Sequence, residues 1–217
     1  MKKENYSTTK FGFYELIKKS LNVDSLSKIH NDSKFIYHTK FKRENDQSTH
    51  FHQLFYNLSR ESVFQKTYKM FISEVIKPMM GGGDVVFQKI PTFRLHFPGN
   101  IAVGEYHRDR NYRDPEWAKK VRELNFFLPL TDAYETNTIW VESEEGKEDF
   151  FPINAKYGQV VMWDGSNLLH GNKTNIEKTT RISFDFRVMK AENYIPSTKG
   201  SINTNTAFAL GGYYDKI

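Results

Sequence analysis

Two short apolar runs stand side by side in VVFQKIPTFRLHF, residues 85–97. Phenylalanine occurs in both runs, with valine and isoleucine in the first and threonine in the second, and these side chains suit the pleated, half-buried surface of a β-strand. Pro91 separates the runs and is typical of a turn or strand boundary. The stretch therefore predicts two strands, 85–90 and 92–97.

Six further runs of this kind follow, with Gly, Pro, Asn and Asp between them. They occupy residues 100–107, 123–130, 137–143, 149–153, 158–164 and 181–189. Eight short strands without intervening helices are typical of a sandwich or a jelly-roll barrel. The sequence therefore predicts a mainly β fold whose jelly-roll core spans residues 85–189.

The N-terminal part, residues 1–84, shows a helical periodicity instead. Phe11, Tyr14, Ile17 and Leu21 recur at three- and four-residue spacing and share one face. A second helical stripe, with Ser59 as its expected N-cap and Pro78 and the three glycines from Gly81 at its end, consists of Val63, Phe64, Thr67, Phe71, Val75 and Ile76. We expect these helices to buttress one sheet.

The remaining segments carry no such pattern. Residues 31–50 are polar and mixed, which predicts a loop or a short strand. The polar extension 190–217 is either an ordered wrap or a mobile tail. We expect one domain, 1–217, with a helical part, a β core and this extension.

The composition excludes several classes of protein. The chain has no cysteine, which removes disulfides, thiolate metal sites and cysteine nucleophiles. Its 31 basic and 26 acidic residues are dispersed, so the net charge of +5 forms no nucleic-acid arm. No segment approaches the ~20 apolar residues of a membrane span, and no signal-peptide core is seen. We expect a cytoplasmic protein that binds a small polar or anionic molecule, and we leave a homo-oligomer open.

Three potential metal ligands lie near strand ends. His107 and Asp109 are two residues apart where the third run ends, so an extended backbone would point both side chains to one face. His170 follows the seventh run and its Asp-Gly turn. Two histidines and a carboxylate with open positions form the facial triad of non-haem Fe(II) oxygenases. A single histidine is more often an ordinary surface or core residue, so the prediction of a metal site depends on the whole set.

A possible anion receptor follows the third ligand. Arg181 and Ser183 are two residues apart in the last run and share a face. A guanidinium fork beside a hydroxyl suits the distal carboxylate of a keto acid whose other end chelates a metal. The alternative is a surface cation paired with Asp185, and Arg187 shares the face of Asp185 and could pair with it instead.

The order His107-x-Asp109, His170, Arg181-x-Ser183 resembles the Fe(II)/2-oxoglutarate-dependent oxygenase superfamily. The stretches that resemble the oxygenases of the streptomycin biosynthesis cluster, and related ones of bacterial carbohydrate gene clusters, are PTFRLHFPGNIAVGEYHRDRNY, LNFFLPLTDAYETNTIWVESEEG and YGQVVMWDGSNLLHGN. The similarity covers residues 91–189.

The resemblance implies a double-stranded β-helix fold. It implies that His107, Asp109 and His170 hold Fe(II), and that Arg181 and Ser183 hold 2-oxoglutarate. The co-substrate would be converted with O2 into succinate and CO2. The implied product is a hydroxylated sugar, nucleotide-linked sugar or other small polar metabolite.

Other polar side chains are candidates for the pocket. By the resemblance, Asn125 and Gln88 could hydrogen-bond the keto acid or a metal-bound oxygen, and Trp140 would line the pocket as a candidate substrate contact. His96 could line the pocket too, but a structural role suits it at least as well. Candidate substrate contacts, each of which could equally be an ordinary solvated group, are Arg110, Tyr112, Arg108, Arg113, Glu142 and Glu144. The remaining histidines, expected on the surface, are His30, His38, His50 and His52.

A second class of function stays open. Jelly-roll barrels also occur in non-redox, cupin-like isomerases and epimerases and in sugar-binding modules. Arg181 discriminates between the classes, because a mere binding module needs no keto-acid receptor beyond its third metal ligand.

Overall fold

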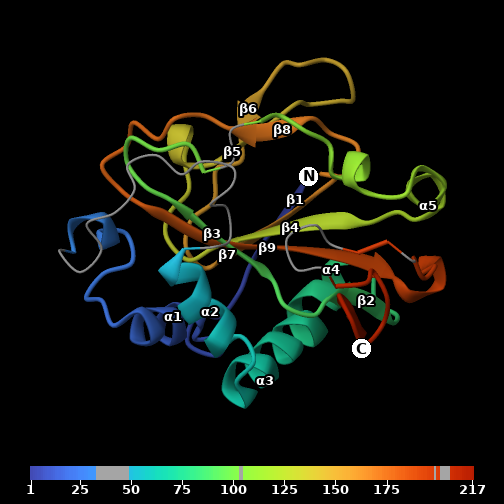
Figure 1. Ribbon diagram of the computed structural model, residues 1–217, viewed down its shortest axis with the longest axis horizontal. Helices are drawn as coiled ribbons and strands as arrows, with labels where there is room; N and C mark the ends of the chain where they lie inside the picture. Colours follow the sequence, from blue (N-terminus) through green and yellow to red (C-terminus); the bar gives the residue numbers. More distant parts are fainter. Residues whose placement is uncertain (33–48, 103–104, 198, 201–205) are drawn as a thin grey trace.

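The computed structural model describes residues 1–32, 49–102, 105–197, 199–200 and 206–217, shown in Figure 1. In chain order, the elements are β1 (Lys2–Asn5), α1 (Phe13–Leu21), η1 (Ile29–Asn31), α2 (His50–Leu58), α3 (Ser62–Phe71), the π-helix η4 (Ile72–Ile76), α4 (Lys77–Met79), β2 (Val85–Gln88), β3 (Thr92–His96), η5 (Asp109–Tyr112), α5 (Pro115–Lys120), β4 (Leu124–Pro129), η6 (Glu135–Asn137), β5 (Ile139–Val141), β6 (Phe151–Pro152), β7 (Gln159–Trp163), β8 (His170–Asn172), β9 (Arg181–Lys190), η7 (Ala191–Asn193) and β10 (Tyr214–Lys216).

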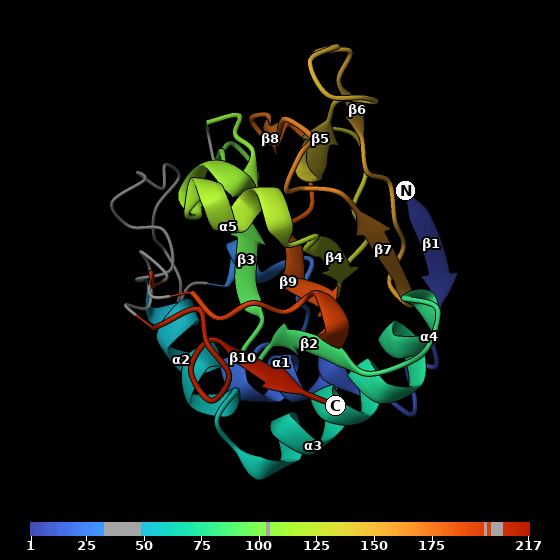
Figure 2. The same cartoon turned by 90° about the vertical axis from the view of Figure 1, so that its right-hand side faces the viewer.

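Two antiparallel sheets form the centre of the molecule, which confirms the mainly β prediction. The larger sheet has the strand order β1-β7-β4-β9-β2-β10, and β3 also pairs with β9. The smaller sheet has the order β6-β5-β8. Helices α1–α3 lie on one side of the larger sheet and the smaller sheet lies on the other (Figure 1). The view from the side shows β1 at one edge of the larger sheet and β10 beside β2 (Figure 2).

The two faces of strand β9 differ in polarity. Successive strand side chains point to opposite faces, so Ile182, Phe184 and Phe186 point one way and the charged residues between them point the other. The apolar set is fully buried in the core that the helices complete. The rings of Phe64 and Tyr68 in α3 contact those of Phe184 and Phe186 at centroid distances of 5.8 and 5.6 Å. The helices therefore cover the apolar side and leave the other side for a site.

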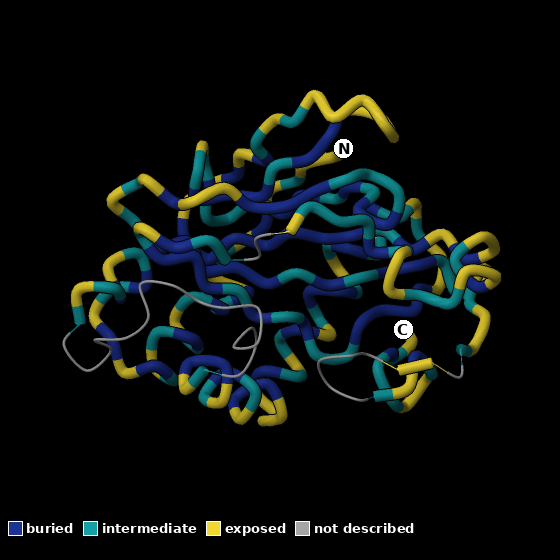
Figure 3. Tube along the Cα trace, turned by 45° about the horizontal axis from the view of Figure 1, so that its top comes forward, coloured by how far each residue is buried: buried dark blue, intermediate teal, exposed yellow. Residues whose placement is uncertain are grey.

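A second core lies between the two sheets. It includes Phe127, Val161 and Trp163 from the larger sheet and Ile139 and Val141 from the smaller one. Figure 3 shows buried residues running along the central strands and exposed residues gathered in the connecting segments. The polar side of β9 faces the same space between the sheets, so a pocket can form beside this apolar packing.

The N-terminal helices differ from the prediction in three details. Helix α1 matches the first stripe, but α2 was not predicted, and Ser59 lies at its C-terminal end rather than capping α3. The Ser59 hydroxyl donates to the Tyr56 carbonyl at 2.9 Å. Val63 is exposed, whereas Tyr68 is fully buried, because the buried face of α3 follows Phe64, Tyr68 and Phe71 at four- and three-residue spacing.

Seven of the eight predicted strands are present. The exception is 100–107, where the described residues form no strand and only His107 makes an isolated bridge; residues 103–104 lie outside the described residues. Short strands β1, β8 and β10 were not predicted. Strand β10 pairs with β2, so the last residues form an ordered wrap. No described helix is long and apolar enough to cross a membrane.

The histidines expected on the surface divide. His50 is exposed and His30 is half-buried, but His52 is buried, which contradicts the prediction. The His52 ring packs 5.9 Å from the ring of Phe93, and its Nδ1 lies 2.7 Å from the Thr49 hydroxyl. His38 lies outside the described residues.

Candidate metal centre and pocket

Backbone pairing brings His107 and His170 together. The amide N–H of each donates to the carbonyl of the other, at 2.9 and 3.0 Å, in an isolated antiparallel bridge. Directly opposed residues of such a bridge present their side chains on the same face. The two imidazole rings accordingly lie 4.4 Å apart.

Asp109 completes the group where the extended backbone changes into the 3₁₀ helix η5. Its amide N–H donates to the Gly165 carbonyl at 3.0 Å, which ties it to the turn after β7. Asp109 Oδ1 lies 3.5 Å from His107 Nε2 and 3.8 Å from His170 Nε2. One ligand atom from each of the three residues lies within 4.8 Å of the others. The predicted three side chains are thus brought together.

The hydrogen bonds of both histidines fix which nitrogen faces the centre. His107 Nδ1 lies 2.9 Å from the Glu105 carbonyl, and His170 Nδ1 lies 2.9 Å from the Leu168 carbonyl. A carbonyl can only accept, so each Nδ1 carries the proton and each Nε2 presents its lone pair. This is the arrangement of metal-binding histidines.

The charge states also suit a metal. Burial, above all, lowers the pKa of His170 to about 4, so the ring is neutral at physiological pH. Burial opposes the ionisation of Asp109, but the charge of Arg187 and the hydrogen bond from Asn125 hold the pKa of that carboxyl well below its usual range. Two imidazole nitrogens and one carboxylate oxygen on one side of a centre fit a divalent transition metal such as Fe(II).

Arg181 lies fully buried in the same pocket, with an exposed fraction of 1 %. Its Nε donates to the Asn137 carbonyl at 3.0 Å and its Nη1 donates to the Ser183 hydroxyl at 2.8 Å. No carboxylate of the described residues forms an ion pair with it. Burial, above all, lowers the pKa of Arg181 to about 10, with Asp185 raising it and Arg94 lowering it. A buried cation without a bonded anion is expensive, so this group is suited to bind one.

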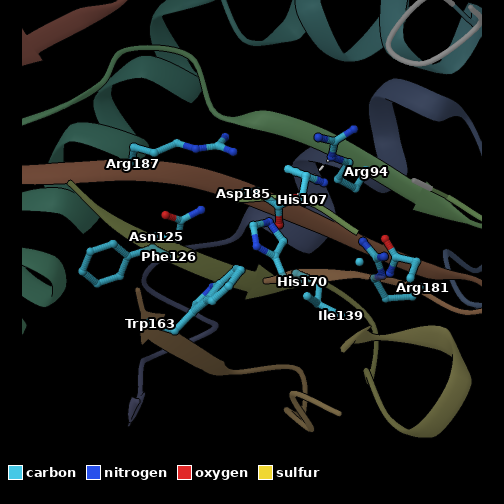
Figure 4. A pocket seen from close by; sticks show the side chains of 12 residues that line it. Arg94, His107, Asn125, Phe126, Ile139, Trp163, His170, Arg181, Asp185 and Arg187 are labelled. Atoms are coloured by element: carbon cyan, nitrogen blue, oxygen red, sulfur yellow. Dashed lines mark hydrogen bonds and ion pairs between the residues drawn. The ribbon is translucent and has the colours of Figure 1, made fainter. Parts of the chain in front are cut away.

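A pocket between the two sheets joins the metal ligands to Arg181. Its volume is about 480 Å³, open mouth included. The lining includes His107, His170, Arg181, Trp163 and Ile139. Figure 4 shows the two histidines between Arg187 at one end and Arg181 at the other. A molecule with an anionic group at each end could therefore reach from the metal site to Arg181.

Asn125 and Gln88, both expected near the co-substrate, differ in whether they line the pocket. Asn125 lines the pocket, but its Nδ2 donates to Asp109 Oδ2 at 2.8 Å. Gln88 does not line it: its Nε2 donates to the Ile90 carbonyl at 2.7 Å and to the Thr92 hydroxyl at 3.1 Å.

Trp140 does not reach the pocket either, which corrects the prediction. Ile139 lines the pocket from β5, and strand alternation turns the next side chain away. The Trp140 indole N–H donates to the Glu135 carbonyl at 2.8 Å, and the Lys173 ammonium lies 3.1 Å from the centre of its ring. His96 is buried between the backbone carbonyls of Asn100 and Asn137, in a structural role.

The charged loop after the metal ligands is largely paired. Arg110 contacts Glu145 at 2.5 Å at the molecular surface, and Tyr112 is 39 % exposed with its ring 5.4 Å from that of His107. Arg108 points away from the ligands and pairs with buried Glu142 at 2.7 Å.

Three other candidate substrate contacts are paired with protein groups. Arg113 pairs with buried Glu123 at 2.9 Å. Glu142 also accepts from the backbone N–H of Leu169 at 2.6 Å, so it anchors a loop and is not open to a sugar. Glu144 is exposed and pairs with Lys147 at 2.8 Å.

Arg187 is a site residue whose role was not predicted. The expected pair with Asp185 is wrong: Arg187 Nη2 lies 2.7 Å from Asp109 Oδ2, and Asp185 pairs with Arg94 at 3.3 Å. The alternation of side chains along a strand does predict that four residues of β9 share one face: Arg181, Ser183, Asp185 and Arg187. It could not show that Asp109, far away in sequence, lies opposite that face.

Comparison with known proteins gives one clear sequence relative. No protein-family model matches the chain. The streptomycin biosynthesis protein StrG of Streptomyces griseus is 38% identical over 176 residues, which cover 81% of this chain and 80% of StrG. Among solved structures, AviO1 of Streptomyces viridochromogenes is 15% identical with a TM-score of 0.48, covering 87% of this chain and 90% of AviO1. EvdO2 of Micromonospora carbonacea var. aurantiaca, complexed with 2-oxoglutarate, is 15% identical with a TM-score of 0.45 and 65% of each chain covered.

Proposed function

The chain belongs to the family of the streptomycin biosynthesis protein StrG, and from that premise we propose that it is a non-haem Fe(II)/2-oxoglutarate-dependent dioxygenase. The proposed reaction hydroxylates a sugar, a nucleotide-linked sugar or another small polar metabolite, while 2-oxoglutarate and O2 give succinate and CO2. The observation that carries the proposal is that one pocket combines a His-Asp-His ligand set with a buried arginine that forms no ion pair with any carboxylate of the described residues. The two facing sheets are, on this proposal, those of a double-stranded β-helix.

The three ligands would hold the metal through His107 Nε2, His170 Nε2 and Asp109 Oδ1. Bound Fe(II) supplies the activation of O2 and the oxidation of a C–H bond. Because all three ligands come from one side, the opposite side is left for the co-substrate and the substrate. The chain's own part is to turn the Nε2 atom of each histidine toward the metal, to keep His170 neutral and to keep the carboxylate ionised.

Arg181 would bind the C5 carboxylate of 2-oxoglutarate. Its Nε and Nη1 are already held by Asn137 and Ser183, which fixes the plane of the guanidinium and leaves Nη2 for a ligand. The Ser183 hydroxyl accepts from Arg181, so its own proton is available to the same carboxylate. Charge-assisted bonds of this kind are the strong ones, and in a buried pocket they select an anion over a neutral group.

The walls of the pocket would protect the reaction from water and the protein from its own oxidant. Ile139, Phe126 and Trp163 supply apolar surface beside the ligands, and the Trp163 ring packs 4.6 Å from that of His170. The prime substrate would enter over Tyr112 and Arg110, which lie in η5, where the Tyr112 ring is 5.4 Å from that of His107. Trp140 has no part in this proposal.

Succinate formation tests the proposal. Purified protein with Fe(II), 2-oxoglutarate and O2 should release succinate, and the correct sugar or nucleotide-linked sugar in a panel should stimulate release. His107→Ala should abolish it, and His50→Ala, a change at an exposed histidine, should not. If the metal-loaded protein consumes no 2-oxoglutarate with any member of the panel but changes one of them without O2, the non-redox, cupin-like isomerase or epimerase is correct instead.

A further inference from the structure

We propose that Arg187 and Asn125 are positioning residues that make Asp109 a one-oxygen metal ligand. This inference rests on the metal site of the proposed function. The Arg187 guanidinium carries no lone pair to give to a metal, and the Asn125 side chain turns its amide nitrogen, a donor, toward Asp109. Both act through the carboxylate that they hold.

The two oxygens of Asp109 have different surroundings. Oδ2 accepts three hydrogen bonds, from Arg187 Nε at 3.0 Å, Arg187 Nη2 at 2.7 Å and Asn125 Nδ2 at 2.8 Å. Oδ1 is the oxygen that lies 3.5 and 3.8 Å from the two histidine Nε2 atoms. Three donors occupy the lone-pair directions of Oδ2, so only Oδ1 is left to a metal.

Arg187 and Asn125, which together clamp Asp109, come from two neighbouring strands of the larger sheet. Asn125 in β4 and Arg187 in β9 are direct Cα partners in the antiparallel ladder, so their side chains rise from the same face next to each other. Asn125 needs the adjacent turn to lack a side chain, since a Cβ on Gly165 would lie 2.6 Å from the amide. Gly165 also accepts the Asp109 amide N–H at 3.0 Å. Gly165 therefore helps to position both Asn125 and the ligand Asp109.

Charge explains why the clamp is an arginine. Asp109 is buried, and burying a carboxylate without a bonded cation is costly. Arg187 offsets that cost from the far side of the carboxylate, where it does not occupy the metal's position. A guanidinium gives two parallel bonds and a fixed direction, whereas a lysine ammonium would give charge without the fork.

Cobalt binding tests the inference without relying on catalysis. Co(II) is titrated anaerobically into wild type, Arg187→Lys, Arg187→Met and Asn125→Leu, with the Kd taken from calorimetry and the ligand geometry from the visible absorption of the bound ion. The matched control is Arg113→Met, which removes a similarly buried arginine–carboxylate pair that does not touch a ligand. Arg187→Lys keeps the charge and serves if Arg187→Met does not fold.

We expect the Kd for Co(II) to rise by about 10- to 100-fold in Arg187→Met. It should rise less in Arg187→Lys and Asn125→Leu. The absorption of the bound Co(II) should change in all three and stay as in wild type in Arg113→Met. A merely structural salt bridge would lower the melting temperature of the apo-protein but leave the Kd and the spectrum unchanged, and that outcome would overturn the inference. Wild type that binds no Co(II) at all would overturn the proposed function with it.

Discussion

His107 and His170 are held together by their backbones, each amide donating to the other's carbonyl at 2.9 and 3.0 Å. The backbones of the two histidine ligands are therefore positioned by a β-bridge. Asp109 then joins through the Gly165 carbonyl and the clamp of Arg187 and Asn125. Because the ligand geometry depends on these backbones, the site should be sensitive to small changes in them.

Gly171 is the first position at which this sensitivity can be measured. A Cβ there would lie 2.8 Å from the Tyr106 ring, directly after the ligand His170. We expect Gly171→Ala to lower the free energy of unfolding by roughly 1–3 kcal/mol, because either the ring or the strand must shift. Urea denaturation measures this change. Gly12→Ala is the control, because nothing lies within 4 Å of a Cβ at Gly12; an equal effect in both variants would show that Tyr106 does not constrain this strand.

Removal of His107 should remove the metal and leave the fold. His107→Ala takes one nitrogen from a three-ligand site whose backbone bridge does not need the side chain. We expect metal content after Fe(II) or Co(II) loading to fall below a tenth of the wild-type value, with an unchanged circular dichroism spectrum. Full metal content in this variant would mean that the ion sits elsewhere.

Arg181→Met should separate co-substrate binding from metal binding. The loss of a charge-assisted contact, worth about 1.5–3 kcal/mol, corresponds to roughly a 10- to 100-fold weaker Kd for 2-oxoglutarate. Calorimetry in the presence of Mn(II) measures that Kd, and metal content should stay as in wild type. Arg108→Met, which breaks the pair with Glu142 outside the pocket, is the matched control. An unchanged Kd in Arg181→Met contradicts its role as the receptor.

His96 predicts how the stability of the protein depends on pH. Burial first, and the charge of Arg181 second, lower the pKa of His96 to about 3 from 6.5. Between about pH 6.5 and pH 3, His96 is therefore protonated in the unfolded chain and neutral in the folded protein. Stability is fully present above pH 6.5 and is lost as the pH falls toward 3, by up to about 1.4 kcal/mol per pH unit from this group.

Urea denaturation of wild type and His96→Gln between pH 7 and pH 4.5 checks this slope. The variant should show a flatter pH dependence, and His50→Gln, a change at an exposed histidine, should keep the wild-type slope. Parallel curves for wild type and His96→Gln would contradict the assignment of the slope to His96.

Much of the β core could be predicted from local pattern, because the runs from Val85 to Met189 have the composition of half-buried strands. Strands β1, β8 and β10 were missed because each is short and polar, and their pairing depends on partners distant in sequence. Helix α2 was missed because its buried face is not wholly apolar: it includes His52.

The ligand set could be predicted because residue type, spacing and order are all local. The partners of Asp109 could not, because they belong to strands β4 and β9, which come together only in the folded sheet. The same limit explains Trp140: one residue of strand register decides which side chain faces the pocket, and the sequence does not fix that register.

The most direct test of the central claim is the visible spectrum of the protein mixed anaerobically with Fe(II) and 2-oxoglutarate. If His107, Asp109 and His170 hold iron while Arg181 holds the co-substrate, chelation of the iron by the keto acid should give a weak visible charge-transfer band. The band should be absent in His107→Ala and should require a higher 2-oxoglutarate concentration in Arg181→Met. Iron-replete wild-type protein that shows no such band at saturating 2-oxoglutarate would contradict the account.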